Sequence, residues 1–255
     1  MSDIVKLERR GQCLEITLDR PKANAIDNAT TVELSKAFVS FRDDQDLRVA
    51  IITGTGRFFS AGWDLKAAAS GEVEEIEVDG GFAGITEMFD LEKPVIAAVN
   101  GFAYGGGFEI ALACDMIVAS QTASFGFPEV KRGLIATSGA LFRAPRTLPL
   151  NIAREMLLTG GEYPAARMEQ IGVVNYVVDP GASLSKAIEL ASTITENSPV
   201  AVQQTTKVLD HIIGDNDDLG WNETKLGREI IEKSEDRAEG VSAFFERRKP
   251  NWPGR

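Results

Sequence analysis

The sequence predicts an α/β fold, and three features of the chain indicate it. Short apolar runs alternate with segments of helical periodicity, and strands interleaved with helices are typical of this class. Each short apolar run is bounded by Gly, Pro or Asp, as strands usually are. After about residue 180 the strand pattern stops, and the polar, charged segment 199–255 is expected to be helical.

The predicted strands differ in pattern. Residues 14–18 alternate apolar and polar side chains, whereas 49–53 (VAIIT), 95–99 (VIAAV) and 116–119 are continuous apolar runs. A continuous short run of this kind predicts a buried strand. The segment 71–81 is acidic and lacks a core pattern, so we expect a mobile surface loop there.

Two helices are predicted to bury one face each, at 30–41 and 183–195. The expected buried positions are Val32, Leu34, Phe38 and Phe41 in the first and Leu184, Ala187, Ile188, Ala191 and Ile194 in the second. A turn is predicted at 216–220, followed by a helix to about residue 237.

Composition argues against several classes of function. The 255 residues carry a net charge of −11, which disfavours general attraction to DNA or RNA, although local Lys and Arg can still bind a small anion. Cys13 and Cys114 lie in apolar settings, so we expect buried thiols, which are too few for a zinc site. No apolar run reaches membrane-spanning length, and the charged N-terminus does not fit a signal peptide. We expect a cytoplasmic protein without nucleic-acid or membrane partners.

The first candidate motif is FFSAGWDLK at 58–66, directly after a predicted strand. Small residues at Ala61 and Gly62 allow a ligand to approach the backbone closely, and the N–H of Trp63 can then point at a developing negative charge. The alternative is an ordinary strand-to-helix turn in which Asp64 caps the helix. This stretch alone favours the alternative.

Three consecutive glycines precede Glu109 in the second motif, GFAYGGGFE at 101–109. Glycine is costly in conformational entropy, so the triplet indicates a requirement of the backbone. A helix is predicted to begin near Gly107, and N–H groups at a helix start suit an oxyanion. Glu109 falls in the first turn and can face the same space. The alternative is a Glu that only benefits from the helix dipole.

The third motif, FGFPE at 125–129, places Glu129 after a proline-fixed turn among aromatic residues. Apolar surroundings raise the pKa of a carboxyl group and allow it to donate a proton near neutral pH. The alternative is a surface Glu that forms an ion pair of little energetic value with Lys131 or Arg132.

Other catalytic motifs do not fit. The run 54–56 (GTG) lacks the third glycine of a dinucleotide fingerprint, with Phe59 in its place, and the glycine triplet is not followed by the Lys-Ser/Thr of a P-loop. Ser138 is not in a nucleophile elbow. The only histidine, His211, lies in the polar tail, which argues against a Ser-His-Asp triad and a His-based metal site. Carboxylates are the remaining acid–base groups.

Taken together, these motifs resemble the crotonase (enoyl-CoA hydratase/isomerase) superfamily. The segments that carry the likeness, in matching order and separation, are RPKANAID at 20–27, FFSAGWDLK at 58–66, KPVIAAVNGFAYGGGFEIALACDMIVAS at 93–120, ASFGFPEVKRGLI at 123–135 and AFFERRKPNW at 243–252. Within the superfamily, the stretches 14–27, 41–54, 58–69 and 80–84 are similar to carnitinyl-CoA dehydratases.

The resemblance implies a ClpP-like spiral of repeated ββα units over residues 1–195, with a C-terminal helical region, 196–255, that supports trimers or hexamers built as dimers of trimers. It implies an oxyanion hole formed by the N–H groups of Trp63 and Gly106. It implies no metal and no cofactor, since coenzyme A is part of the substrate. The implied CoA and substrate contacts are Lys22, Ala61, Gly62, Asp64, Leu65, Lys66, Phe244 and Arg247.

The implied activity is that of a hydro-lyase acting on acyl-CoA thioesters. Water adds to 2-enoyl-CoA or leaves 3-hydroxyacyl-CoA, with Glu109 acting on the water and Glu129 on the Cα proton. The presence of both glutamates favours this over an enoyl-CoA isomerase or a catalytically silent acyl-CoA-binding protein. Ala136 and Ala140 stand where the family usually has Pro and Gly, which leaves the acyl preference open. Candidate aromatic partners for a trimethylammonium acyl group are Trp63, Phe82, Phe102 and Tyr104.

Overall fold

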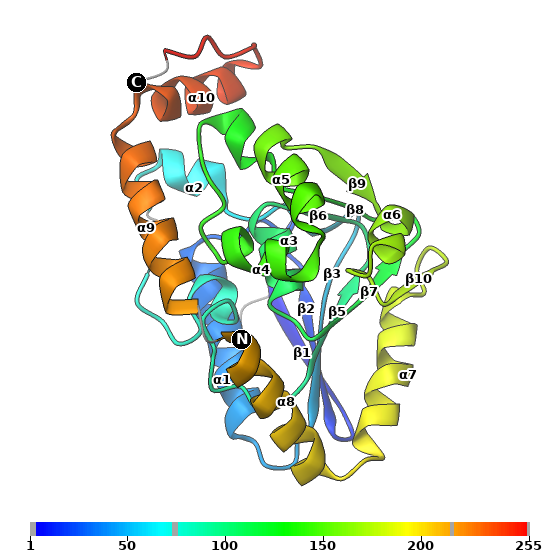
Figure 1. The fold of residues 1–255 in the computed structure, drawn as a ribbon. Coiled ribbons are helices and arrows are strands. Elements are labelled where there is room, and N and C mark those ends of the chain that lie inside the picture. Colours follow the sequence, from blue (N-terminus) through cyan, green and yellow to red (C-terminus); the bar gives the residue numbers. More distant parts are fainter. Residues whose placement is uncertain (1–3, 73–75, 215–216, 254–255) are drawn as a thin grey trace.

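Two β-sheets organise the fold (Figure 1), and the computed structural model describes residues 4–72, 76–214 and 217–253. The larger sheet has the strand order β1-β2-β3-β5-β7-β10, and the smaller has the order β4-β6-β8-β9. The strands of the larger sheet are β1 (Val5–Arg10), β2 (Cys13–Leu18), β3 (Val49–Gly54), β5 (Val95–Val99), β7 (Met116–Ser120) and β10 (Tyr176–Val178). Those of the smaller sheet are β4 (Phe58–Ser60), β6 (Phe102–Tyr104), β8 (Ser124–Gly126) and β9 (Glu162–Pro164).

Helices follow or cover these strands. They are α1 (Asn28–Asp43), α2 (Leu65–Ala69), α3 (Gly106–Leu112), α4 (Ala140–Thr147), α5 (Leu150–Thr159), α6 (Ala165–Gln170), α7 (Ser183–Thr195), α8 (Pro199–Gly214), α9 (Asp217–Lys233) and α10 (Glu235–Glu246), with the 3-10 helices η1 (Phe82–Gly84) and η2 (Pro128–Arg132). Figure 1 shows α8, α9 and α10 following one flank of the molecule. No helix in the described ranges combines the length and the apolar character needed to cross a membrane.

A repeat along the chain builds both sheets. β3, β5 and β7 pair in parallel in the larger sheet, and each leads directly into a strand of the smaller sheet, β4, β6 or β8. These three short strands also pair in parallel, with Ser60 opposite Ala103 and Tyr104 opposite Gly126. This arrangement is the predicted crotonase spiral. Because the short strands are parallel, with a register shift between Phe58 and Ser60 where β4 pairs with β6, the three segments that follow them, each with a candidate motif, begin side by side.

The central strands β3, β5 and β7 of the larger sheet are covered on both faces, which explains their continuous apolar runs. Val49 and Ile51 of β3 pack with α7 in one cluster. Ala50 and Ile52, the alternate residues of the same strand, belong to the main core, which includes Phe38 of α1. Side chains that alternate between two covered faces must all be apolar, so this strand shows no polar–apolar alternation.

The predicted strands 14–18, 49–53, 95–99 and 116–119 are confirmed as β2, β3, β5 and β7, and the two predicted helices are confirmed as α1 and α7. The helix predicted near residue 107 begins at Gly106. Val32 is only half-buried, unlike the other predicted core positions of α1. Both cysteines are free thiols; Cys13 is buried as expected, whereas Cys114 is half-buried. His211 is exposed on α8.

The turn predicted at 216–220 is wrong: residue 216 lies outside the described ranges, and residues 217–220 open α9. Within that helix Gly220 packs its bare Cα against the ring of Phe142, and a Cβ there would be 2.7 Å from the nearest ring atom. The helix predicted to reach about 237 ends at Lys233, and Ser234 caps the next helix by accepting from a backbone N–H three residues on. Within the segment 71–81, residues 73–75 lie outside the described ranges, and the others form a surface loop without helix or strand.

Candidate active site

The backbone of residues 61–64 lies along that of residues 23–26, and one of its N–H groups has no partner among the described residues. The other three donate to neighbouring oxygens at 2.8–3.1 Å. These bonds are Ala61 N to Ala23 O (3.0 Å), Gly62 N to Ser60 Oγ (3.1 Å) and Asp64 N to Ile26 O (2.8 Å). The Trp63 N–H donates to no group in the described part of the chain. It is therefore the donor of this segment that a ligand can use.

Gly106 supplies a second donor of the same kind. It is the first residue of α3, where N–H groups have no partner within the helix, and its N–H donates to no other described residue. A Cβ built on Gly62 would lie 2.5 Å from Gly106 N, and Gly62 has φ +79°, so only glycine permits this approach. The turns that carry Trp63 and Gly106 are therefore in backbone contact.

Glu109 lies one turn into α3, with 2% of its surface exposed. Its Oε1 accepts hydrogen bonds from the N–H groups of Ser138 (2.8 Å) and Ala140 (2.9 Å), where the chain enters α4. A carboxylate buried without such donors would be strongly destabilising. Ala136 and Ala140, the two departures from the family pattern, are both buried, and Ala140 acts on Glu109 through its backbone.

Glu129 lies in η2, and its carboxylate approaches the turn at Gly105 that precedes α3. A Cβ built on Gly105 would lie 2.8 Å from Glu129 Oε1, and Gly105 O accepts the Glu109 N–H at 3.0 Å. The Oε2 atom of Glu129 is buried. Gly105 has φ +56°, and this bare Cα is what lets the Glu129 carboxylate approach the start of α3. The turn at Gly105 thus joins the backbone of Glu109, the carboxylate of Glu129 and the two predicted oxyanion donors.

Arg132 connects the Glu129 segment to the C-terminal helix. Its guanidinium donates to Pro128 O at 3.1 Å and lies 5.0 Å from the centre of the Phe244 ring of α10. Burial lowers the pKa of the Arg132 guanidinium, and the nearby Glu129 carboxylate opposes that shift. Phe244, a predicted CoA contact, therefore packs within the same chain against η2, the helix that carries Glu129.

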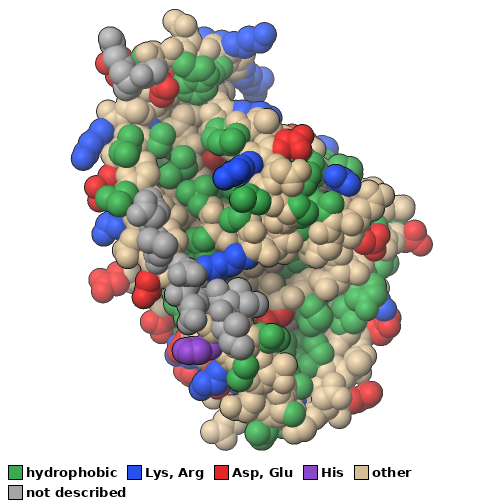
Figure 2. Space-filling view, viewed as in Figure 1, with side chains coloured by type: hydrophobic (Ala, Val, Ile, Leu, Met, Phe, Trp, Pro, Cys, Tyr) green, Lys and Arg blue, Asp and Glu red, His purple; other side chains and the backbone are tan. Residues whose placement is uncertain are grey.

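The other predicted CoA contacts differ in solvent exposure and in the bonds that their side chains already form. Lys22 and Lys66 are exposed, while Ala61 and Leu65 are half-buried. Asp64 is occupied by structural bonds, since its side chain caps α2 at Lys66 N (2.9 Å) and pairs with Arg20 (2.8 Å). Arg247 ends α10 and is exposed. Figure 2 shows Lys and Arg side chains at this α10 end of the molecule, although the whole chain is acidic.

The aromatic candidates separate into two groups. Phe82 lies at the site, because a Cβ built on Gly106 would be 2.6 Å from its ring. Phe102 and Tyr104 instead stack on each other on the smaller sheet, with centroids 5.6 Å apart. The Arg57 guanidinium lies over Phe102, and Tyr104 donates to Glu162 at 2.8 Å. The side chains of Phe102 and Tyr104 are thus already engaged.

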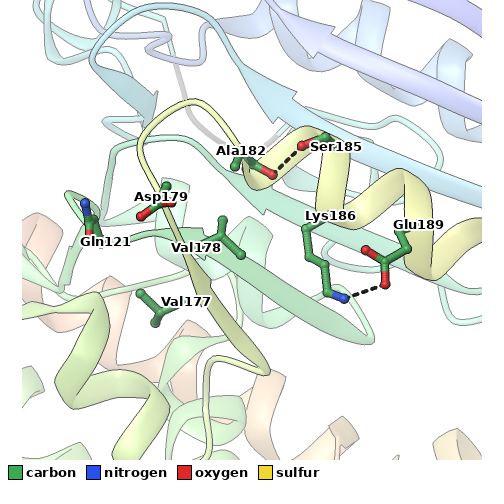
Figure 3. A pocket seen from close by; sticks show the side chains of 8 residues that line it. All are labelled: Gln121, Val177, Val178, Asp179, Ala182, Ser185, Lys186 and Glu189. Carbon is green, nitrogen blue, oxygen red and sulfur yellow. Dashed lines mark hydrogen bonds and ion pairs between the residues drawn. The ribbon is translucent and has the colours of Figure 1, made fainter.

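A surface hollow of about 500 Å³ lies elsewhere, between β10 and α7 (Figure 3). Its lining includes Asp179, Lys186 and Glu189, of which the last two form an ion pair at 2.7 Å. None of the predicted site residues lines it. In the described ranges no three His, Cys, Asp or Glu side chains are grouped so that they could hold a metal ion.

Backbone N–H groups at the turn to which Glu109 is bonded and which Glu129 approaches are of a kind that can stabilise an oxyanion while carboxylates move protons. The sequence profile of the enoyl-CoA hydratase/isomerase family matches residues 8–255. The chain belongs to the enoyl-CoA hydratase/isomerase family.

Several members of this family are similar to the chain over its whole length. The carnitinyl-CoA dehydratases of Salmonella arizonae and Citrobacter koseri are 49% and 48% identical to this chain, over 100% of both sequences. Among solved structures, carnitinyl-CoA hydratase from Mycobacterium avium matches with a TM-score of 0.93 at 41% identity. Enoyl-CoA hydratase from Mycobacterium tuberculosis matches with a TM-score of 0.80 at 44% identity, and both comparisons cover 100% of each chain.

Sequence reasoning missed the residues that hold the site in shape. Asn24 is buried with φ +48° and donates to Thr55 O and Phe58 O at 3.0 and 2.8 Å. Ser138 was considered only as a nucleophile, whereas its N–H holds Glu109. The motif at 20–27 indicated that this loop matters, but its partners are distant in sequence.

Proposed function

We propose that this protein is a hydro-lyase that adds water to the double bond of a 2-enoyl-CoA thioester and removes it from a 3-hydroxyacyl-CoA. One observation carries the proposal: the Trp63 and Gly106 N–H groups, which have no partner among the described residues, lie at the turn that the Glu129 carboxylate approaches and to which the Glu109 N–H is bonded. Two donors suit a thioester oxygen, and two carboxylates suit the two proton movements of hydration.

In the proposed mechanism the thioester oxygen accepts hydrogen bonds from Trp63 and Gly106. This polarisation makes Cβ of the enoyl group electrophilic and lets negative charge build on the oxygen. Glu109 takes a proton from water as the water oxygen bonds to Cβ. Glu129 gives a proton to Cα as the enolate collapses, so the product is the 3-hydroxyacyl thioester. Neighbouring carboxylates titrate as a coupled pair, and variants of each assign the roles.

The proposed substrate is the carnitinyl-CoA and crotonobetainyl-CoA pair. Full-length relatives at 48–49% identity are named carnitinyl-CoA dehydratase, which supports this choice. A trimethylammonium group is stabilised by an aromatic face, and Phe82 is the aromatic candidate whose ring lies against Gly106. The alternatives are an enoyl-CoA isomerase, which can work with one carboxylate, and a catalytically silent acyl-CoA-binding protein.

Glu129→Gln tests the chemistry. We expect this variant to lose nearly all hydration of crotonyl-CoA, followed by the absorbance of the conjugated thioester, while it still binds the CoA ester by calorimetry. Glu189→Gln is the control, since Glu189 is exposed on α7, away from the predicted site residues, and forms a surface ion pair with Lys186. Near-normal turnover by Glu129→Gln would remove this carboxylate from the mechanism. A wild-type protein that binds the ester without turnover would support the silent alternative.

The substrate is tested by comparing kcat/KM for crotonobetainyl-CoA and crotonyl-CoA. The carnitine assignment predicts a clear preference for crotonobetainyl-CoA. Phe82→Leu keeps an apolar side chain but removes the aromatic face, so it should reduce kcat/KM for the cationic substrate more than for crotonyl-CoA. A preference for crotonyl-CoA in the wild type would contradict the carnitine assignment.

The proposal extends to assembly and location. Exposed apolar side chains on α8, α9 and α10 support a trimer or a hexamer of two trimers formed through residues 196–255; they include Val208, Leu226, Ile230 and Phe245. Figure 2 shows hydrophobic side chains over the α9–α10 end. Phe244 and Arg247 would contact CoA there. Light scattering tests this, and a monomer would contradict it. The free thiols support a cytoplasmic location.

A further inference from the structure

Backbone hydrogen bonds from the loop before α1 fix the position of the segment that carries Trp63. Backbone bonds join residues 23–26 to residues 61–64, and they include Ile26 N to Gly62 O at 2.8 Å. Since every other N–H of residues 61–64 is bound, the direction of the Trp63 N–H depends on the position of this loop. The question is what holds the loop against residues 61–64.

Arg20 bridges the two segments. Its Nη1 pairs with Asp64 Oδ2 at 2.8 Å and donates to Ala25 O at 3.0 Å, and its Nη2 pairs with Asp27 Oδ2 at 2.7 Å. The Arg20 side chain is only 23% exposed, and those of Asp27 and Asp64 are 18% and 15% exposed. Water therefore screens these charges less than it screens a surface pair.

Both carboxylates are anchored at their other oxygen. Asp27 Oδ1 accepts from Thr30 N at 2.8 Å and caps α1, while Asp64 Oδ1 accepts from Lys66 N at 2.9 Å and caps α2. The guanidinium thus ties together the starts of two helices. Asp64 directly follows Trp63, so this tie limits movement of the oxyanion donor itself. A planar fork that binds two carboxylates in fixed directions suits this task better than a single ammonium.

We propose that Arg20 is a positioning residue for the reaction, and that its pairs with Asp27 and Asp64 hold the Trp63 N–H in the direction that the thioester oxygen requires. The inference rests on the proposed function, because it assigns a task to one of the two proposed oxyanion donors. It also gives Asp64 a task other than contact with CoA, since both of its carboxylate oxygens are already bound.

The test replaces Arg20 with Met and with Lys, and Asp64 with Asn. Arg20→Met should lower kcat for crotonyl-CoA hydration by about 10- to 100-fold, the range expected when a catalytic group shifts by up to about 1 Å, with little change in KM. Arg20→Lys should recover part of the loss. Asp64→Asn should lower kcat in the same way, and the double variant should lose no more than Arg20→Met alone, since the two side chains act as one unit.

The decisive readout is the carbonyl stretching frequency of an isotope-labelled enoyl-CoA bound to each variant. Wild-type protein should lower that frequency relative to free thioester, and Arg20→Met should lower it less. Arg10→Met is the matched control, because Arg10 also binds two carboxylates at 2.8 Å, those of Glu8 and Glu15, but on β1. This control should keep the wild-type kcat and frequency shift.

The outcomes separate the two proposals. If wild-type protein neither polarises nor hydrates the thioester, the proposed function and the inference both fall. If wild type does both, and folded Arg20→Met matches it in kcat and frequency shift, the inference alone is overturned. If Arg20→Met does not fold by circular dichroism, Arg20→Lys and Asp64→Asn carry the test. Wild-type kcat and frequency shift in both of these would overturn the inference.

Discussion

Replacing Gly105 with Ala places one methyl group between α3 and Glu129. The added Cβ would lie 2.8 Å from Glu129 Oε1, whereas an ordinary contact is 3.4 Å or more, so the carboxylate or the turn must shift by about 0.6 Å. A displacement of about 1 Å in a catalytic group can cost about a hundredfold in rate. We therefore expect a loss of about tenfold in kcat, measured as crotonyl-CoA hydration.

A second cost accompanies this variant, because Gly105 has φ +56°. An L residue forced to a positive φ costs about 1–2 kcal/mol, which lowers Tm without involving Glu129. Gly11→Ala is the matched control: Gly11 has φ +61° and open space around the position of its Cβ. Gly11→Ala should lose stability and keep kcat.

Two results would refute the reasoning. A folded Gly105→Ala protein with wild-type kcat would show that Glu129 does not act from its position beside Gly105. An equal loss of kcat in Gly11→Ala would show that backbone strain, rather than displacement of Glu129, lowers the rate. Thermal unfolding followed by circular dichroism provides the Tm of each variant for this comparison.

Three further outcomes are expected. Ala140→Pro removes an N–H that donates to Glu109, at a first helical position where proline is tolerated; kcat should fall about tenfold, Tm should also fall because the buried carboxylate loses a donor, and an unchanged kcat would deny that bond a positioning role. Burial raises the pKa of the Cys13 thiol to about 11 and that of Cys114 well above its ordinary value. Because the thiolate is the reactive form, both should resist iodoacetamide near neutral pH until the protein is unfolded, and rapid native labelling seen by mass spectrometry would contradict this. Phe38→Ala, at a fully buried position, should lower the free energy of unfolding by about 3–5 kcal/mol in urea titrations, and a loss below 1 kcal/mol would contradict its core role.

Sequence patterns predicted best the strands whose surroundings require apolar side chains at every position. β3, β5 and β7 are covered on both faces, so each is a continuous apolar run that ends at a turn. β1 was missed because it is an edge strand with several charged, exposed side chains. β4, β6, β8 and β9 have three residues each, too few to show a period.

Glycine positions led to one correct prediction and one wrong prediction from the sequence. The triplet at 105–107 correctly indicated a backbone requirement, because Cβ atoms there would meet Glu129, Phe82 and Ser60. Gly220 suggested a turn for the same reason and was wrong. Its requirement is close contact between a helix and an aromatic ring, which no local pattern distinguishes from a turn.

The sequence by itself indicated the chemical groups of the proposed site: two carboxylates and two turns with small residues, each following a predicted strand. Only the tertiary structure decided which groups support them. Ser138 and Ala140 hold Glu109 from about thirty residues away, and Arg20 reaches Asp64 across the loop and α1. The physical reason is that hydrogen bonds and ion pairs depend on distance in space. The folded chain sets that distance, and no neighbouring residue in the chain reveals it.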